Sequence, residues 1–352
     1  MQEQDIAYDS LRSLARRHKR ILVYGAGGGG DALGAVHLYM KLKDYGAEPI
    51  IGSVVWERFP VDPYPGPIPL ETLINAEPIG WSAALVTGES VALRYGYEVK
   101  FQLARVAGAL GVEGLFIDIS KGVVGVAEAL RAAREALEVE AVIALDTGGD
   151  ILAVGCEDNL WSPLADAVSL AGLAEAGLPA LVAVHGPGAD GELSQDQVLR
   201  YISRIAGEDG LIEVSGLSKM ETEYISRIME NIYSESSKIP VYAFKGEYGE
   251  KEIRAKTRRV HVNPVTAATF ILDAGKVFQW SEQAKAVSGT RGIGQAKERL
   301  NAYCIVTELD LELELSRLKE SPTPRAQTLD EIRRSLRRRL MARGCKAFSC
   351  KA

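Results

Sequence analysis

The sequence is poor in cysteine, with four residues among 352. This number is too small for a disulfide scaffold in a chain of this length, so we expect free thiols. Cys156 and Cys304 lie in apolar stretches and are interpreted as buried thiols. Cys345 and Cys350 lie near the C-terminus, and without a second pair or a nearby histidine their spacing is only a weak signal for a metal site.

A membrane span, a signal peptide and an excess of basic charge are also missing. The most apolar stretch, 164–184, is interrupted by Asp166 and Glu175 and does not reach the length that crosses a bilayer. Residues 1–20 lack an apolar region followed by a cleavage site. Acidic residues outnumber basic ones by 47 to 41, which does not fit a general nucleic-acid binder. We therefore expect a cytoplasmic protein without membrane or nucleic-acid partners.

Glycine is abundant, with 35 residues, in a chain whose 47% hydrophobic and 25% charged residues are typical of globular proteins. Short apolar runs alternate with longer segments of helical periodicity. This alternation predicts an α/β protein with a doubly wound, mostly parallel, Rossmann-like sheet and a smaller C-terminal portion. The expected strands are 21–24, 49–55, 82–86, 114–119, 141–145 and 179–184, and the expected helices are 31–45, 98–110, 124–138 and 163–176.

Local signals mark several helix boundaries. Ser162 followed by Pro163 predicts a helix start, and Gly177 predicts its end. The same reasoning predicts a second such helix from Asn263–Pro264 to Gly275. Three further pairs have the spacing of a capping box, namely Ser194 with Gln197, Ser218 with Glu221 and Thr328 with Glu331.

We expect the chain to have three parts. Residues 1–275 form the Rossmann-like ligand-binding domain, 276–320 form an extension packed on it, and 321–352 form a linker, 321–327, and a basic helix. Five prolines in 60–69 predict a stiff connection that is neither helix nor central strand. The alternation in 303–315 predicts a late strand.

The C-terminal helix is predicted by an apolar stripe of Leu329, Ile332, Leu336 and Leu340. One interpretation is a solvated surface helix that docks by this stripe. Two others are a contact in a homo-oligomer and a contact with a phosphate-rich partner. The oligomer contact and the phosphate-rich partner are both suggested by the arginines of this helix, which are Arg333, Arg334, Arg337, Arg338, Arg339 and Arg343.

Nearly every predicted strand ends in glycine beside polar residues, at the edge where parallel sheets bind ligands. Gly25, Gly27 and Gly30 fit G-x-G-x-x-G between a strand and a helix, so we expect the loop 25–30, including Gly28 and Gly29, to bind phosphate through its N–H groups. Asp31 at the helix start and the lack of an acidic residue at the end of 49–55 weigh against a nicotinamide dinucleotide. A tight turn capped by Asp31 is the structural alternative.

Carboxylates are concentrated in 146–166. Asp146 and Asp150, with Gly148 and Gly149 between them, follow a predicted strand, and we interpret them as Mg²⁺ ligands or a catalytic base. Glu157 and Asp158 are further candidate metal ligands, and Asp166 is a weaker candidate for function. The structural alternatives are that Asp146 and Asp150 cap turns and that Glu157 and Asp158 are solvated.

Single residues at other strand ends complete the candidate site. His185 is interpreted as a catalytic acid or base, or as a hydrogen-bonded structural histidine. Glu57 and Arg58, Glu89, and Lys121 are candidate ligand-binding residues. No P-loop, G-x-S-x-G, H-E-x-x-H or paired C-x-x-C pattern is present, so the sequence does not support P-loop NTPase, serine hydrolase, zincin or zinc-ribbon chemistry.

Four blocks together resemble an uncharacterised family, mainly archaeal, that is catalogued as a domain of unknown function. They are GAGGGGD (25–31), WERFPVDPYPGPIP (56–69), the DTGGD and GCEDNLWSPLADA segments (146–167), and HVNPVTAATFILD (261–273). The resemblance covers about 15–310 and excludes the tail after 321. It implies an intracellular metabolic protein and carries no catalytic roles, because the family has no established activity.

From these features we expect an enzyme that binds a small phosphorylated or nucleotide-like metabolite at the glycine-rich loop, with a carboxylate site for Mg²⁺. The first alternative is an NAD(P)-dependent oxidoreductase. The second is a metabolite-binding regulatory protein without catalytic activity, in which the basic C-terminal helix contacts a partner.

Overall fold

The computed structural model describes residues 8–157, 160–319 and 328–348. In this part of the chain a ten-stranded sheet has the order β3-β4-β6-β2-β1-β7-β8-β12-β9, with β5 paired to β4. A separate hairpin is formed by β10 and β11. The strands are β1 Arg20–Gly25, β2 Glu48–Val54, β3 Leu73–Pro78, β4 Ala83–Arg94, β5 Tyr97–Val99, β6 Gly114–Ile117, β7 Ala141–Thr147, β8 Ala180–His185, β9 Leu211–Gly216, β10 Gly249–Ile253, β11 Arg258–Val262 and β12 Ala268–Asp273.

The centre of the sheet is parallel, which confirms the predicted α/β class. Strands β6, β2, β1, β7 and β8 run in one direction, whereas β4 and β12 pair antiparallel with β6 and β8. Every residue of β7 is buried, as expected for a strand that is covered by helices on both sides. The carboxyl ends of β1, β7 and β8 therefore meet at one edge.

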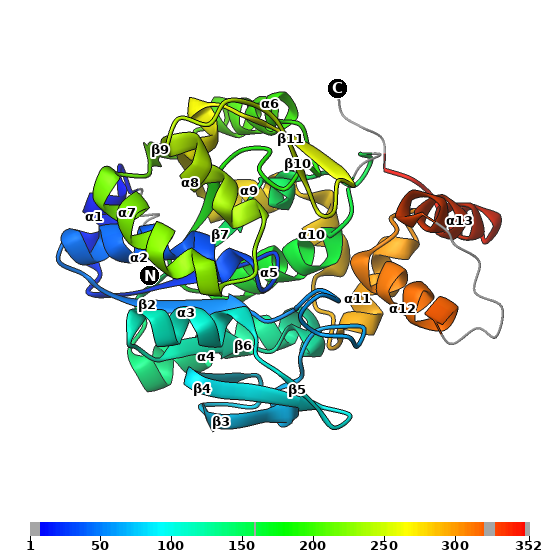
Figure 1. Ribbon diagram of the computed structural model, residues 1–352, viewed down its shortest axis with the longest axis horizontal. Coiled ribbons are helices and arrows are strands. Elements are labelled where there is room, and N and C mark those ends of the chain that lie inside the picture. The colour runs from blue at the N-terminus through cyan, green and yellow to red at the C-terminus, as the bar shows by residue number, and fades with distance from the viewer. Residues whose placement is uncertain (1–7, 158–159, 320–327, 349–352) are drawn as a thin grey trace, which may run out of the picture.

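Helices cover both faces of the sheet (Figure 1). One apolar core joins the sheet to α1 Leu11–Arg17, α2 Asp31–Asp44, α3 Gln102–Leu110, α7 Lys219–Ile228 and α8 Ile239–Phe244. The other joins it to α4 Gly122–Leu137, α5 Pro163–Ala176, α6 Gln195–Gly207, α9 Ala274–Trp280, α10 Glu282–Val287 and α11 Ile293–Asn301. The short 3-10 helices are η1 Leu70–Thr72, η2 Ile119–Lys121, η3 Asp150–Leu152, η4 Met229–Asn231, η5 Ser236–Lys238 and η6 Pro264–Ala267.

The predicted helix from Pro264 to Gly275 is wrong. Asn263 does cap a turn by accepting a hydrogen bond from the Val265 N–H, but that turn is only η6. The following segment forms β12, which pairs with β8 on one side and β9 on the other. Pairing with the edges of β8 and β9 outweighs the local helix-start signal, because tertiary pairing overrides weak local propensity.

The predicted strand at 303–315 is also wrong, because most of this segment lies in helix α12 Glu308–Lys319. Its alternation of acidic and apolar residues conceals a helical face. Glu308 and Glu312, four residues apart, are both buried and lie on the same side of the helix. A half-buried strand would expose these two glutamates to solvent, whereas helix α12 buries them where it packs on the rest of the protein.

The C-terminal helix forms as predicted and docks by its stripe. Helix α13 spans Leu329–Ala342, and Ile332 is 2% exposed where it packs with Trp161, Val306 and Leu311. Figure 1 shows α13 (red) beside α12 (orange) at one side of the molecule. The predicted linker 321–327 lies outside the described residues.

The prediction of free thiols is wrong. Cys304 and Cys345 form a disulfide with 5.2 Å between their Cα atoms, and Cys156 is also disulfide-bonded. Folding brings these distant positions together, which a count of cysteines does not reveal. The expectation of a cytoplasmic protein, whose thiols would be kept reduced, is therefore not supported by the cysteines. Within the described chain, no helix is both long and apolar enough to span a bilayer.

Candidate metal centre

Six acidic side chains gather at the carboxyl edge of β1, β7 and β8. Asp31 opens α2, Asp146 lies near the end of β7, Asp150 opens η3 and Asp166 lies in the first turn of α5. Asp190 and Glu192 lie in the loop between β8 and α6. All six are buried. The topology of a parallel sheet thus brings residues from five segments to one place.

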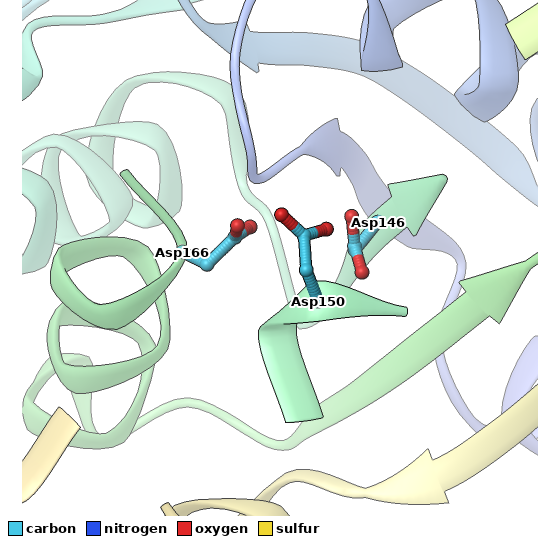
Figure 2. A group of neighbouring side chains, drawn as sticks. All are labelled: Asp146, Asp150 and Asp166. Atoms are coloured by element: carbon cyan, nitrogen blue, oxygen red, sulfur yellow. The ribbon is translucent and has the colours of Figure 1, made fainter. Parts of the chain in front are cut away.

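Asp146, Asp150 and Asp166 converge most closely, with one carboxylate oxygen from each within 4.8 Å of the others. Figure 2 shows the three carboxylates pointing toward one another from β7, η3 and α5. Asp146 also accepts hydrogen bonds from the Gly149 N–H at 2.9 Å and the Ile151 N–H at 3.2 Å. Asp146 therefore caps a turn, as the structural alternative predicts, and also belongs to the cluster.

Asp166 has the least compensated charge of the three. Neither of its carboxylate oxygens finds a hydrogen-bond donor among the residues that the structure describes. The side chain is 3% exposed, so solvent does not supply the missing partners. A buried carboxylate without donors is strongly destabilising unless it is protonated or binds a cation.

Burial and mutual repulsion disfavour ionisation throughout this cluster. Burial first, and then the neighbouring carboxylates, raise the pKa values of Asp146, Asp150 and Asp166 well above those of ordinary aspartates. Burial also raises the pKa of Asp31 to about 6. A bound divalent cation would reverse this balance, because it favours the ionised form of every carboxylate around it.

Asp150 also belongs to a second group, with Asp190 and Glu192. Glu192 differs from Asp166 because it is fully provided with donors. It accepts hydrogen bonds from the N–H groups of Trp161 and Ser162, from the Ser162 hydroxyl and from the Arg254 guanidinium. Burial opposes ionisation of Glu192, but Arg254 and these hydrogen bonds lower its pKa to about 2.

Two glycines make room for the carboxylates. A Cβ atom on Gly27 would lie 2.8 Å from Asp166 Oδ1 and 2.9 Å from Asp31 Oδ2, and the Gly27 N–H donates to Asp31 Oδ2 at 2.8 Å. Gly148, at φ +127°, would place a Cβ against the Asp190 carboxylate. Gly27 is partly exposed. The glycine-rich loop therefore lies between the acidic cluster and solvent.

The same loop lies beside Glu57 and Arg58, which the sequence singled out. Glu57 is buried beneath Gly29 and accepts a hydrogen bond from the Gln102 N–H at 2.8 Å, and burial raises its pKa to about 7. The Arg58 side chain is 39% exposed and lies 3.7 Å from the position of a Cβ on Gly28. Arg58 thus offers a cationic group at the outer side of the loop.

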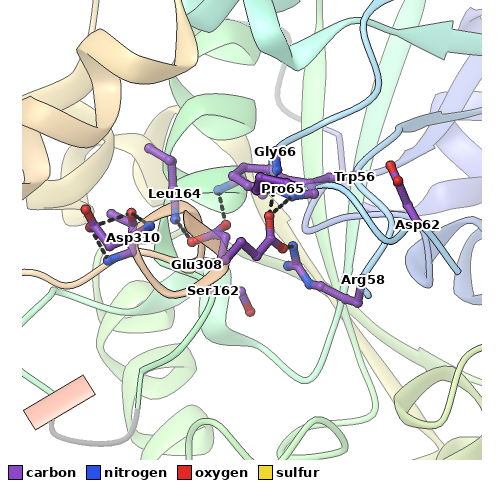
Figure 3. A network of polar contacts seen from close by, with 12 residues as sticks. Trp56, Arg58, Asp62, Pro65, Gly66, Ser162, Leu164, Glu308 and Asp310 are labelled. Atoms are coloured by element: carbon purple, nitrogen blue, oxygen red, sulfur yellow. Dashed lines mark hydrogen bonds and ion pairs between the residues drawn. The ribbon is translucent and has the colours of Figure 1, made fainter. Parts of the chain in front are cut away.

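Helix α12 holds the surrounding segments in place (Figure 3). Glu308 accepts hydrogen bonds from the N–H groups of Leu164 and Ala165 and so caps the N-terminus of α5, which carries Asp166. Glu312 accepts from the Trp56 indole, the Gly66 N–H and the Arg58 guanidinium. The extension thereby fixes both Arg58 and the start of the helix that carries Asp166.

His185 lies next to this site in a separate hydrogen-bonded pair. Its ring stacks on His37 at 4.2 Å, and the Thr269 hydroxyl bridges His185 Nδ1 and His37 Nε2 at 2.8 and 2.9 Å. Burial lowers the pKa values of both histidines, that of His37 to about 4. These contacts are those of a hydrogen-bonded structural histidine, which is one of the two interpretations of His185 made from the sequence.

Three predicted residues do not join the cluster. Glu157 is engaged by the N–H groups of Val154 and Gly155 and by the Tyr201 hydroxyl. Glu89 is exposed within β4, which runs past the predicted strand end, and Lys121 forms ion pairs with Glu71 and Asp118. Asp158 lies outside the described residues.

Sequence reasoning missed Asp190, Glu192 and Arg254. The first two follow β8 within HGPGADGE, a segment noted for its glycines, and the strand-end rule applied to all its carboxylates would have found them. Arg254 directly follows strand β10 and reaches Glu192 from a hairpin far along the chain. No local pattern in the sequence marks it.

Comparison with known proteins settles the family. Residues 22–316 match the family model described as "Protein of unknown function (DUF1152)". The chain belongs to this family. The DUF1152 match includes the glycine-rich loop, all six carboxylates of the edge and both Glu308 and Glu312 of α12, and it ends before α13. Neither the curated proteins nor the solved structures contain a match.

Proposed function

We propose that the protein binds one divalent cation of the Mg²⁺ class between Asp146, Asp150 and Asp166. The observation that carries this proposal is the pair of buried, donor-free oxygens of Asp166, directed at two further carboxylates. Oxygen-only ligands at the end of a parallel strand match the preference of Mg²⁺, which commonly shares such ligands with a phosphorylated substrate.

The second part of the proposal is the ligand, a small phosphorylated or nucleotide-like metabolite that is the substrate of an enzyme. The glycine-rich loop would offer the ligand N–H groups other than those of Gly27 and Gly29, which donate to Asp31 and to the Trp56 carbonyl. Arg58 supplies a cationic side chain next to Gly28. Asp31 and Asp166 at Gly27 would repel a phosphate that arrived alone. A cation between the carboxylates and the phosphate removes this repulsion, so we expect metal and ligand to bind together.

This coupling separates the proposal from the NAD(P)-dependent alternative. A dinucleotide on a Rossmann loop binds its diphosphate at the helix N-terminus without a metal. We therefore expect NAD(H) and NADP(H) to bind weakly in the absence of a divalent cation. Tight binding of either dinucleotide in EDTA would favour the oxidoreductase and contradict the proposed phosphate site.

Titration of the metal-free protein with Mn²⁺ tests the cation site directly. We expect the wild type to bind one Mn²⁺ per chain. Binding is measured by calorimetry and by electron paramagnetic resonance. Asp166→Asn removes the carboxylate charge without changing its size and should weaken binding by at least tenfold. The matched control is Asp196→Asn, at an aspartate whose side chain is 80% exposed on α6.

A thermal-shift series then tests the ligand. The panel contains nucleotides, sugar phosphates and organic acids, each with and without Mg²⁺. A bound ligand at 100 times its Kd stabilises the folded state by about 2.7 kcal/mol, which a melting curve detects. We expect a shift of the melting temperature that needs both Mg²⁺ and a phosphoryl group.

If the wild type and Asp166→Asn bind Mn²⁺ equally in the titration, the assignment of the metal site is wrong.

A further inference from the structure

The acidic edge has the layout of a two-cation centre. Asp150 is shared by two groups of carboxylates, one with Asp146 and Asp166 and the other with Asp190 and Glu192, and within each group one oxygen per residue lies within 4.8 Å of the others. A shared carboxylate between two oxygen-rich positions is the arrangement that bridges paired metal ions in many hydrolytic and phosphoryl-transfer sites.

The two positions differ in how far their charge is already balanced. Asp166 has no donor among the described residues, whereas Glu192 accepts four hydrogen bonds. A carboxylate has about four lone-pair directions, so Glu192 has none left for a metal ion. One of its donors, Arg254 Nη1 at 2.9 Å from Glu192 Oε1, carries a full positive charge.

Arg254 is held at this position by its own backbone. It begins the turn of the β10–β11 hairpin, where Arg254, Ala255 and Lys256 all have positive φ, at 51°, 52° and 67°. The Arg254 N–H donates to Glu235, and its carbonyl accepts from the Thr257 hydroxyl at 2.6 Å. The carboxylates of Glu192, Asp190 and Asp150 outweigh the effect of burial and raise the pKa of Arg254.

We infer that the Arg254 guanidinium takes the place of a second cation, so that the centre accepts a single divalent ion beside Asp166. This inference rests on the proposed function, because it concerns the stoichiometry of that metal site. Arg254 is therefore a specificity-determining residue. It balances Glu192 without a metal. Its charge also favours the ionised form of Asp190, whose Oδ2 has no hydrogen-bond partner among the described residues. Asp146, Asp150 and Asp166 are left to be balanced by one divalent ion.

The test is the number of Mn²⁺ ions bound by the full-length protein, measured by equilibrium dialysis with elemental analysis. We expect one ion in the wild type and two in Arg254→Met, which keeps much of the side-chain volume but removes the charge. The two ions should be spin-coupled in electron paramagnetic resonance, because paired metals that share a carboxylate lie about 4 Å apart. Arg254→Lys, which keeps the charge, should bind one.

The control for loss of charge on the hairpin is Arg259→Met, at a side chain that is 74% exposed and pairs with Glu252. It should bind one ion. The wild-type measurement needs no variant, and two ions in the wild type would overturn the inference even if Arg254→Met did not fold. One ion in both the wild type and Arg254→Met would also overturn it while leaving the proposed site intact. Binding of no ion by the wild type would refute the proposed site as well.

Discussion

At the scale of single residues, this protein concentrates charge where solvent is absent. Asp31, Glu57, Asp166 and Asp190 are all buried, and burial raises the pKa value of each. Among the six carboxylates of the edge, Glu192 has a lowered pKa, because a guanidinium and three further donors face it. The folded state without metal is therefore expected to bind protons that the unfolded chain releases at neutral pH.

Glu57 gives a prediction with a defined sign. Its pKa is about 7 in the folded state and 4.5 in an ordinary glutamate, so the folded protein holds a proton between these values that the unfolded chain has lost. The contribution of Glu57 to stability is full below pH 4.5 and is lost as the pH rises through 7, by at most about 3 kcal/mol. Glu57→Gln resembles the protonated form and should lose less stability between pH 5 and 8.

The measurement is urea denaturation of the wild type and of Glu57→Gln in EDTA at pH 5 and at pH 8. Glu98→Gln, at an exposed glutamate of β5, serves as the control and should follow the wild type. Equal pH dependence of the free energy of unfolding in wild type and Glu57→Gln would show that Glu57 does not titrate in this range.

How much of the site the sequence predicts depends on how local the signal is. Asp146 and Asp150 are found because they come directly after the apolar run 141–145, which forms most of β7. The proximity of Asp166 and Glu192 to them depends on α5 and the β8–α6 loop returning to the same edge. Arg254 depends on a hairpin that is placed by tertiary packing alone, and the two disulfide-bonded positions Cys156 and Cys304 are likewise brought to their partners only by folding.

At the scale of elements, tertiary context decides where local signals conflict. The segment 268–273 follows a helix-start signal and forms a strand, and 308–319 alternates like a strand and forms a helix. The prediction for α13 succeeded because its apolar stripe has one periodicity throughout and finds one partner surface, formed by Trp161, Val306 and Leu311.

The docking of α13 is testable through Ile332, its single fully buried side chain among the described residues of that helix. Ile332→Ala truncates the side chain that is most deeply buried at this interface, and such substitutions cost about 2–5 kcal/mol in well-packed cores. We expect α13 to detach more often and its arginines to be cut sooner by trypsin. Met341→Ala, at a side chain that is 61% exposed on the same helix, should leave the cleavage rate unchanged. Equal rates for the wild type and Ile332→Ala would mean that the stripe does not hold the helix.

At the scale of the whole molecule, the C-terminal part packs on the segment that borders the acidic cluster. The Trp161 ring lies near the guanidinium groups of Arg258 in β11, at 3.8 Å, and Arg333 in α13, at 5.4 Å. The backbone N–H of Trp161 donates a hydrogen bond to Glu192. Phe348 stacks on Tyr303 at 4.1 Å and contacts the Gly155 position. The buried carboxylates and the C-terminal tail are thus connected through one covering segment.

The Cys304–Cys345 disulfide, whose cysteines are separated by 41 positions in the sequence, is expected to secure this contact. A loop of that length lowers the entropy of the unfolded chain enough to contribute about 4 kcal/mol when the whole loop is otherwise free. The variant with Cys304→Ser and Cys345→Ser should melt at a lower temperature than the oxidised wild type and exchange the amide hydrogens of α13 faster. Amides of β7 in the parallel sheet, far from the disulfide in the chain, should keep their protection and serve as the internal control. If α13 exchanges equally fast in both proteins, docking by Ile332 and its neighbours is sufficient and the disulfide adds nothing to this contact.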